Sequence, residues 1–193
     1  MTDKAKLASS LSRRTDVPDF ERPPVVETSL GFYFSPLSGW SFVHVGALWE
    51  QFKAKYPKAE YRPPINFPSD PQKLITEILA DVGRIPFRTC FVDNSNTQLV
   101  QVQNGCFFHN WRKTPDTPQY QHYDTVRPFF QKDWDIFRKF LATNALPVPE
   151  VSRCEVTYFN HLARGEDWQN ISDFSGMFPV CRVTEGAGML QAA

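Results

Sequence analysis

The stretch Thr97-Gln-Leu-Val-Gln-Val-Gln-Asn-Gly-Cys-Phe-Phe-His-Asn-Trp-Arg112 decides the fold. Apolar and polar residues alternate on the Thr97 side of Asn104-Gly105, which is typical of a half-buried strand. Asn-Gly is the strongest short hairpin signal, because both central residues of a type I′ turn need a positive φ. The stretch therefore predicts a β-hairpin with strands over residues 97–103 and 106–112.

A two-residue loop also fixes which residues oppose one another. Val102 then faces Phe107, Val100 faces His109, and Gln98 faces Trp111 on the face that we expect the helices to cover. We therefore expect His109 to be a hydrogen-bonded core histidine rather than a general base. The other face of the hairpin carries Leu99, Gln101, Gln103, Phe108, Asn110 and Arg112.

Periodicity outside the hairpin predicts the remaining elements. Period-two patterns predict strands over residues 25–34, 88–92 and 151–159, and spacings of three and four predict helices over 45–56 and 125–144. The order is strand, helix, three-strand meander, helix, strand. We predict an α+β fold, with two helices packed on one face of a mostly antiparallel sheet.

The chain divides into three parts by composition. Residues 1–22 predict a flexible N-terminal arm, residues 23–163 a single α+β domain, and residues 164–193 an irregular C-terminal segment. Inside the domain, residues 57–86 predict a proline-rich connection with a weak helical pattern over 74–79.

Composition limits the function. Among 193 residues, 21 basic side chains balance 21 acidic ones, which disfavours a nucleic-acid coat. No apolar run is long enough for a membrane span and no secretion signal is apparent, so we expect a cytoplasmic protein without a membrane partner. The four cysteines are far apart and lack paired-ligand spacing, so we expect reduced, mostly buried thiols, and neither a metal site nor a cofactor.

The polar face of the sheet is the candidate surface for binding a ligand or a partner. Alternation places on it Glu27, Ser29, Tyr33, Gln101, Gln103, Asn110, Arg112, Arg153, Glu155 and Thr157. An alternative interpretation is a solvated face, or one covered by a missing segment or a second copy of the chain. We predict a binding module that engages a protein partner or associates with itself, and not an enzyme.

Two other functions remain open. A hydrolase-like site would need Glu27 and Glu155 to form a carboxylate pair near Arg112 or Arg153, although nearby arginines would lower both pKa values and favour a structural ion pair. Aromatic residues near Arg112 are compatible with a single-stranded nucleic-acid binder, which the zero net charge disfavours.

Five ordered segments resemble one sporadically distributed bacterial protein family. They are Asp19-Phe-Glu-Arg-Pro-Pro-Val-Val-Glu27, His44-Val-Gly-Ala-Leu-Trp49, Leu99-Val-Gln-Val-Gln103, Phe108-His-Asn-Trp-Arg112 and Arg153-Cys-Glu-Val-Thr-Tyr-Phe-Asn-His161. The resemblance covers residues 18–175 and carries over no catalytic residue. Members of the family run longer, which implies a missing C-terminal part. Their sporadic distribution implies an accessory role, in defence against mobile elements or beside a neighbouring gene product.

Overall fold

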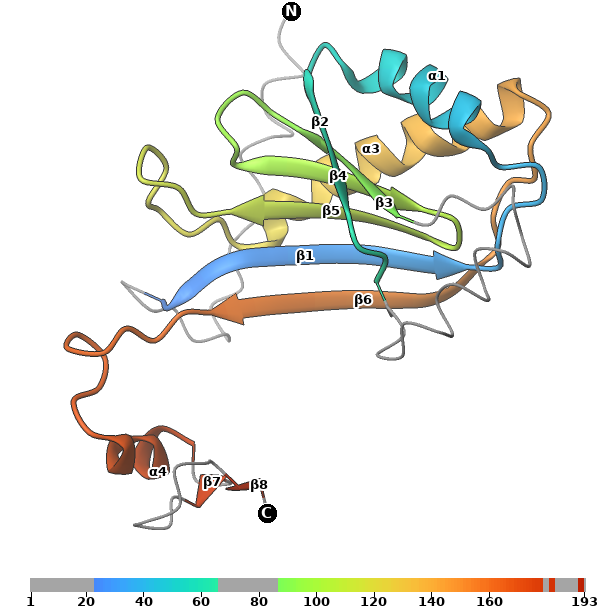
Figure 1. The fold of residues 1–193 in the computed structure, drawn as a ribbon. Coiled ribbons are helices and arrows are strands. Elements are labelled where there is room, and N and C mark those ends of the chain that lie inside the picture. Colours follow the sequence, from blue (N-terminus) through green and yellow to red (C-terminus); the bar gives the residue numbers. More distant parts are fainter. Residues whose placement is uncertain (1–22, 66–86, 179–180, 183–190, 193) are drawn as a thin grey trace, which may run out of the picture.

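A computed structural model describes residues 23–65, 87–178, 181–182 and 191–192 (Figure 1). The elements in chain order are β1 (Val25–Phe34), α1 (Phe42–Phe52), β2 (Lys58–Arg62), β3 (Arg88–Val92), β4 (Gln98–Gln103), β5 (Cys106–Arg112), α3 (Tyr123–Thr143), β6 (Val151–Asn160), a 3-10 helix (Ile171–Asp173), α4 (Phe174–Met177), β7 (Cys181–Arg182) and β8 (Gln191–Ala192).

The main sheet has six strands in the order β2-β3-β4-β5-β1-β6, and every neighbouring pair is antiparallel. Helices α1 and α3 lie on one face of this sheet, as Figure 1 shows. The predicted α+β class is confirmed, as is the β3-β4-β5 meander. The predicted hairpin register is also confirmed, because Val102 pairs with Phe107 and Val100 with His109.

The core lies between the sheet and the two helices. Apolar residues from alternate positions of β1, β4 and β5 pack against the apolar residues of α3, which recur every three or four positions and so share one face of the helix. Among the fully buried side chains are Leu48, Phe52, Phe91, Phe107, Trp111, Phe137 and Leu141. Most aromatic rings in this layer pack edge to face or tilted, as Phe32 does against Phe130 and Trp134, whereas Phe107 stacks on Phe137. The aromatic excess of the sequence is therefore largely core.

The hairpin turn differs from the prediction in its backbone conformation. Gly105 has a φ of 109°, but Asn104 does not have a positive φ, so the turn is not of type I′. Contacts outside the hairpin explain this. The Leu37 amide donates to Oδ1 of Asn104 at 2.6 Å, and the Phe34 amide donates to the Gly105 carbonyl at 2.9 Å.

Strand β2 was not predicted. Its residues Lys58, Glu60 and Arg62 alternate with small or exposed side chains, so the strand has no buried apolar period, and prolines stand on both sides of it. Tyr56, predicted as the last helical residue, is fully buried just beyond the end of α1. The predicted arm at residues 1–22 and the weak helix at 74–79 lie outside the described residues.

Candidate functional site

The register places the whole predicted set on the face opposite the helices. Directly opposed residues of antiparallel strands point to the same side of a sheet. The ladders between β1, β4, β5 and β6 therefore bring to one face Glu27, Ser29, Tyr33, Gln101, Gln103, Asn110, Arg112, Arg153, Glu155 and Thr157. Sequence alternation was sufficient to find this arrangement.

The middle of this face is not the open surface that the alternation predicted. Gln101 is 5% exposed and Asn110 is 2% exposed. Their side chains tolerate burial because they are hydrogen-bonded in a row. Asn110 Oδ1 accepts from Nε2 of Gln101 at 2.5 Å, and Asn110 Nδ2 donates to Oε1 of Glu27 at 2.5 Å. Gln101 and Asn110 are therefore structural residues, which corrects their prediction as a binding surface.

The carboxylate pair required for a hydrolase is not assembled. Glu27 lies opposite Phe159 in the β1–β6 ladder, whereas Glu155 lies opposite Gly31. The backbone positions of the two glutamates are thus offset by four residues along the sheet, roughly 13 Å. Glu27 pairs with Arg112 across β1 and β5, and Glu155 has Arg153 at 3.5 Å. Each glutamate therefore has an arginine on a neighbouring position, and the register does not bring Glu27 and Glu155 together.

Tyr33, Arg153 and Glu155 form a separate group at the β6 side of the face. The guanidinium carbon of Arg153 lies 3.7 Å from the ring centroid of Tyr33, which is a cation–π geometry. Partial burial, followed by the nearby Glu155 carboxylate, raises the pKa of Tyr33. Arg153 and Glu155 remain accessible, with side-chain exposures of 58% and 36%. Of the predicted surface, this group is the part best placed to meet a partner.

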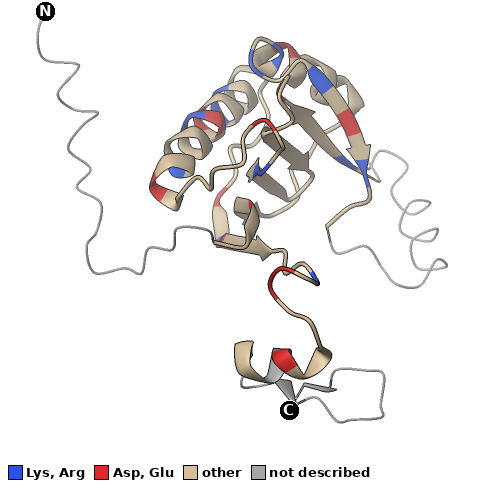
Figure 2. Ribbon diagram, turned by 90° about the vertical axis from the view of Figure 1, so that its left-hand side faces the viewer, with Lys and Arg blue, Asp and Glu red and all other residues tan. Residues whose placement is uncertain are grey.

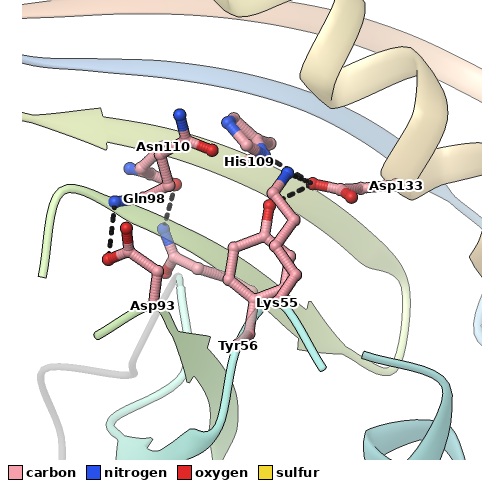
Figure 3. Close-up of polar contacts among 8 residues, drawn as sticks. Lys55, Tyr56, Asp93, Gln98, His109, Asn110 and Asp133 are labelled. Atoms are coloured by element: carbon pink, nitrogen blue, oxygen red, sulfur yellow. Dashed lines mark hydrogen bonds and ion pairs between the residues drawn. The ribbon is translucent and has the colours of Figure 1, made fainter. Parts of the chain in front are cut away.

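A second polar cluster, which the sequence analysis did not predict, lies under the helices. His109 is completely buried, and its Nδ1 lies 2.8 Å from Oδ2 of Asp133 on α3. The Tyr56 hydroxyl donates to the same oxygen at 2.5 Å, and Nζ of Lys55 lies 3.5 Å from it. Figure 3 shows these three side chains converging on the Asp133 carboxylate. The predicted hydrogen-bonded core histidine is thus confirmed.

Asp133 was detectable from the sequence, because it interrupts the apolar stripe of α3. It stands three residues after Phe130 and four before Phe137, both of which are buried. A charged residue at a core position needs a buried partner. Its partner could not be identified, since nothing in the sequence sets the position of α3 over β5.

The Asp133 cluster is built to stabilise the fold rather than to catalyse. Burial lowers the pKa of His109 against the raising effect of Asp133, so the imidazole is neutral at pH 7 and donates from Nδ1 to the carboxylate. Burial likewise raises the pKa of Tyr56 and lowers that of Lys55. His109 and Asp133 are 0% and 1% exposed in their side chains, which keeps them out of reach of a substrate. They connect α3 to β5 and to the chain segment after α1.

The cysteines and acidic residues of the described ranges form no group of three ligands that could hold a metal ion. Cys90 and Cys106 are buried free thiols. Burial raises the pKa of Cys90 and raises that of Cys106 to about 12, so both stay protonated and unreactive. Cys154 on β6 is a free thiol that is exposed, so two of these three cysteines are buried, in agreement with the predicted mostly buried thiols.

The two edges of the sheet differ in character. Edge strand β2 carries basic and acidic residues in alternation, which Figure 2 shows along its length, and Arg62 pairs with Glu60 at 2.6 Å. Edge strand β6 is ten residues long and exposes large apolar side chains on both faces, namely Val151, Val156, Tyr158 and Phe159. A long apolar edge is a template for pairing with another strand, whereas charges protect an edge. The β6 edge is therefore the surface of this sheet most prone to association.

Comparison with family models, curated proteins and solved structures found no match to this chain. None of the helices in the described ranges has the length and apolar character needed to cross a bilayer.

Proposed function

We propose that this chain is a binding module whose interaction surface is the β6 side of the sheet. The surface comprises edge strand β6 and the adjoining side chain of Tyr33. The single observation that carries the proposal is the exposure of apolar residues along an edge strand: Val156 is 48% exposed, Tyr158 43% and Phe159 49%.

An added strand would pair the free backbone groups of the β6 edge and cover its exposed apolar side chains. Arg153 and Glu155 lie on the same strand and would give such pairing a polar, orienting component. Strand addition thus uses three of the residues that the sequence analysis selected, Tyr33, Arg153 and Glu155.

Native mass spectrometry of the gently purified protein tests this function, with a matched pair of variants. Tyr158→Lys introduces a charge on the β6 edge, and Tyr61→Lys introduces the same charge on the β2 edge, where the tyrosine is 65% exposed. We expect the bound protein chain to be lost with Tyr158→Lys and retained with Tyr61→Lys, while both variants keep the wild-type circular dichroism spectrum. Equal retention of the bound chain in both variants would refute the β6 surface.

A further inference from the structure

Within the part of the chain that the structure describes, strand β6 is paired on one side only. Its partner on that side is β1, and no strand of the described residues lies on the other side. An occupant of the free side must match the pattern of β6: Cys154, Val156 and Tyr158 point to the helix-covered side, and Arg153, Glu155, Thr157 and Phe159 point to the opposite side. A second β6 strand carries the same pattern.

Two-fold symmetry restricts how two copies of β6 can pair. In an antiparallel pair, opposed residues point to the same face, so the axis must pass through a residue rather than between two residues. An axis at Arg153 would oppose two arginines, and an axis at Glu155 would oppose two glutamates. Like charges directly opposite each other destabilise a pair of strands.

Axes at the other positions of β6 oppose no like charges, and they differ in what they cover. Those at Ser152, at Tyr158 and nearer either end leave half or more of the strand opposite residues outside β6. An axis at Cys154 would leave Tyr158 and Phe159 opposite residues that precede β6, including Pro149, which has no amide hydrogen to donate. An axis at Thr157 would oppose the Glu155 carboxylate to the aromatic ring of Phe159. Only an axis at Val156 pairs residues 152–160 entirely within the strand.

We propose that β6 pairs antiparallel with β6 of a second copy of this chain, about a two-fold axis through Val156. This inference rests on the proposed function and identifies the strand that pairs with the free side of β6. On the helix-covered side, Val156 meets its own counterpart and Cys154 meets Tyr158 of the partner subunit. Apolar groups thus cover apolar groups at the centre of the interface.

The polar face is complementary in the same register. Glu155 lies opposite Thr157 of the partner subunit, where a hydroxyl donates to a carboxylate. Arg153 lies opposite Phe159 of the partner subunit, while its guanidinium already stacks on Tyr33 at 3.7 Å. The cation is then flanked by two aromatic rings, one from each subunit.

Charge also permits self-association. The formal net charge is zero, so two copies do not repel one another at long range. Because the other edge carries charges of both signs on Lys58, Glu60 and Arg62, the assembly stops at two copies.

Cysteine cross-linking reads the register directly. Antiparallel neighbours have Cα spacings of about 4.5 or 5.5 Å, and both fall within the range that a disulfide spans. The test compares Cys154 in a Cys181→Ser background with Val156→Cys and Thr157→Cys, each made in a Cys154→Ser, Cys181→Ser background. Under mild oxidation we expect only Val156→Cys to give a disulfide-linked dimer in high yield. Efficient linkage at Cys154 or Thr157→Cys instead would overturn the axis.

The oligomeric state tests the occupant. Sedimentation equilibrium of the whole chain should show a species of twice 22.3 kDa that dissociates on dilution. Val156→Lys places two ammonium groups face to face and should weaken the dimer roughly tenfold or more. Tyr61→Lys adds the same charge at β2 and should leave the dimer unchanged.

Failure of this inference is distinguishable from failure of the proposed function. A chain that stays monomeric at its solubility limit, but loses a different bound chain with Tyr158→Lys, would overturn the second copy and retain the β6 surface. A monomer whose interactions are all unaffected by Tyr158→Lys would overturn both.

Discussion

At the scale of single residues, the buried carboxylate of Asp133 constrains how α3 packs on the sheet. One oxygen, Oδ2, accepts from Tyr56 and from His109 and also faces Lys55, in a site that is 1% exposed. Burying polar groups reduces the stability of the fold only a little when every group has its hydrogen-bond partner. Removing one partner reduces the stability much more, because the other group stays buried without a hydrogen bond. The cluster therefore specifies one position of α3 over the sheet.

Replacing Asp133 by Asn should lower the free energy of unfolding by about 2–3 kcal/mol, because the amide lacks the charge that strengthens these hydrogen bonds and buries an NH2 group where Oδ1 of Asp133 has no partner among the described residues. Urea denaturation followed by circular dichroism measures the change. Asp135→Asn, two residues further along α3 and exposed, is the matched control and should stay within about 0.5 kcal/mol of the wild type. Equal effects at the two positions would contradict a buried structural role.

The buried imidazole makes stability depend on pH. Burial lowers the pKa of His109 in the folded state, so the unfolded chain binds more protons as the pH falls below about 6.5. The free energy of unfolding should then decrease on acidification, from the unfolded pKa towards the lower folded one. It should not change in this way above pH 7.

Denaturation curves collected between pH 7 and pH 5 provide the measurement. His109→Asn removes the titrating ring and should flatten the pH dependence of the midpoint relative to wild type. His161→Gln, at an exposed position after β6, should leave that dependence as it is in the wild type. If the slope instead disappears with His161→Gln, the buried imidazole is not its source.

At the scale of elements, β1 and β5 approach closely at Gly31. A Cβ atom placed there would lie 2.1 Å from Cε1 of Phe108, whose ring packs against Tyr33 in a T-shaped geometry at 5.3 Å. The absence of a side chain at Gly31 thus creates the space that Phe108 fills. Gly31 is required for packing and not for a positive φ.

Gly31→Ala should cost about 1–3 kcal/mol of stability, because Phe108 must leave its position to admit the new methyl group. Gly46→Ala in α1 is the informative comparison, since a Cβ there has no atom within 4 Å and removes a flexible residue from a helix. In thermal unfolding we expect Gly31→Ala to lower the midpoint temperature and Gly46→Ala to raise it. Similar shifts of the midpoint temperature would show that the Phe108 side chain can move aside at little cost in stability, which would contradict this prediction.

Most elements were predictable because each has its own period and a clear stop signal. β1, β3 and β5 begin and end at the predicted residues, and Asn104-Gly105 fixed the register of the central hairpin. β2 could not be predicted, since an edge strand with exposed charges has no buried period. The same limit applies to the candidate site: alternation assigned each residue to a face, but whether Asn110 is exposed depends on contacts across strands that the sequence does not give.

At the scale of the whole molecule, the sheet has one charged edge and one apolar edge. Apart from Asp133, the charged residues of α3 are exposed, and Figure 2 shows their positions along the helix. This distribution leaves β6, rather than the helices or β2, as the place for the proposed association.

Hydrogen exchange should distinguish the two edges of the sheet. We expect the slowest amide exchange in the central strands β4 and β5, which are paired on both sides, and fast exchange in β2. Exchange in β6 should slow as the protein concentration rises, because pairing with a second copy protects its outward amides. Mass-spectrometric exchange at two concentrations measures this, with β2 as the internal reference. Protection in β6 that is independent of concentration would argue against self-association.

The position of β1 between β5 and β6 governs the order in which the chain can fold during synthesis. Glu27 contacts Asn110, which is 83 residues later, and Tyr33 accepts from the Ser152 hydroxyl, 119 residues later. At ribosomal speeds, β1 waits roughly 4–17 s for its first neighbour. The meander, whose contacts are local, is free to form before β1 docks beside it. During that interval the alternating strand Val25–Phe34 is exposed to chaperones, and to other nascent chains on the same messenger RNA.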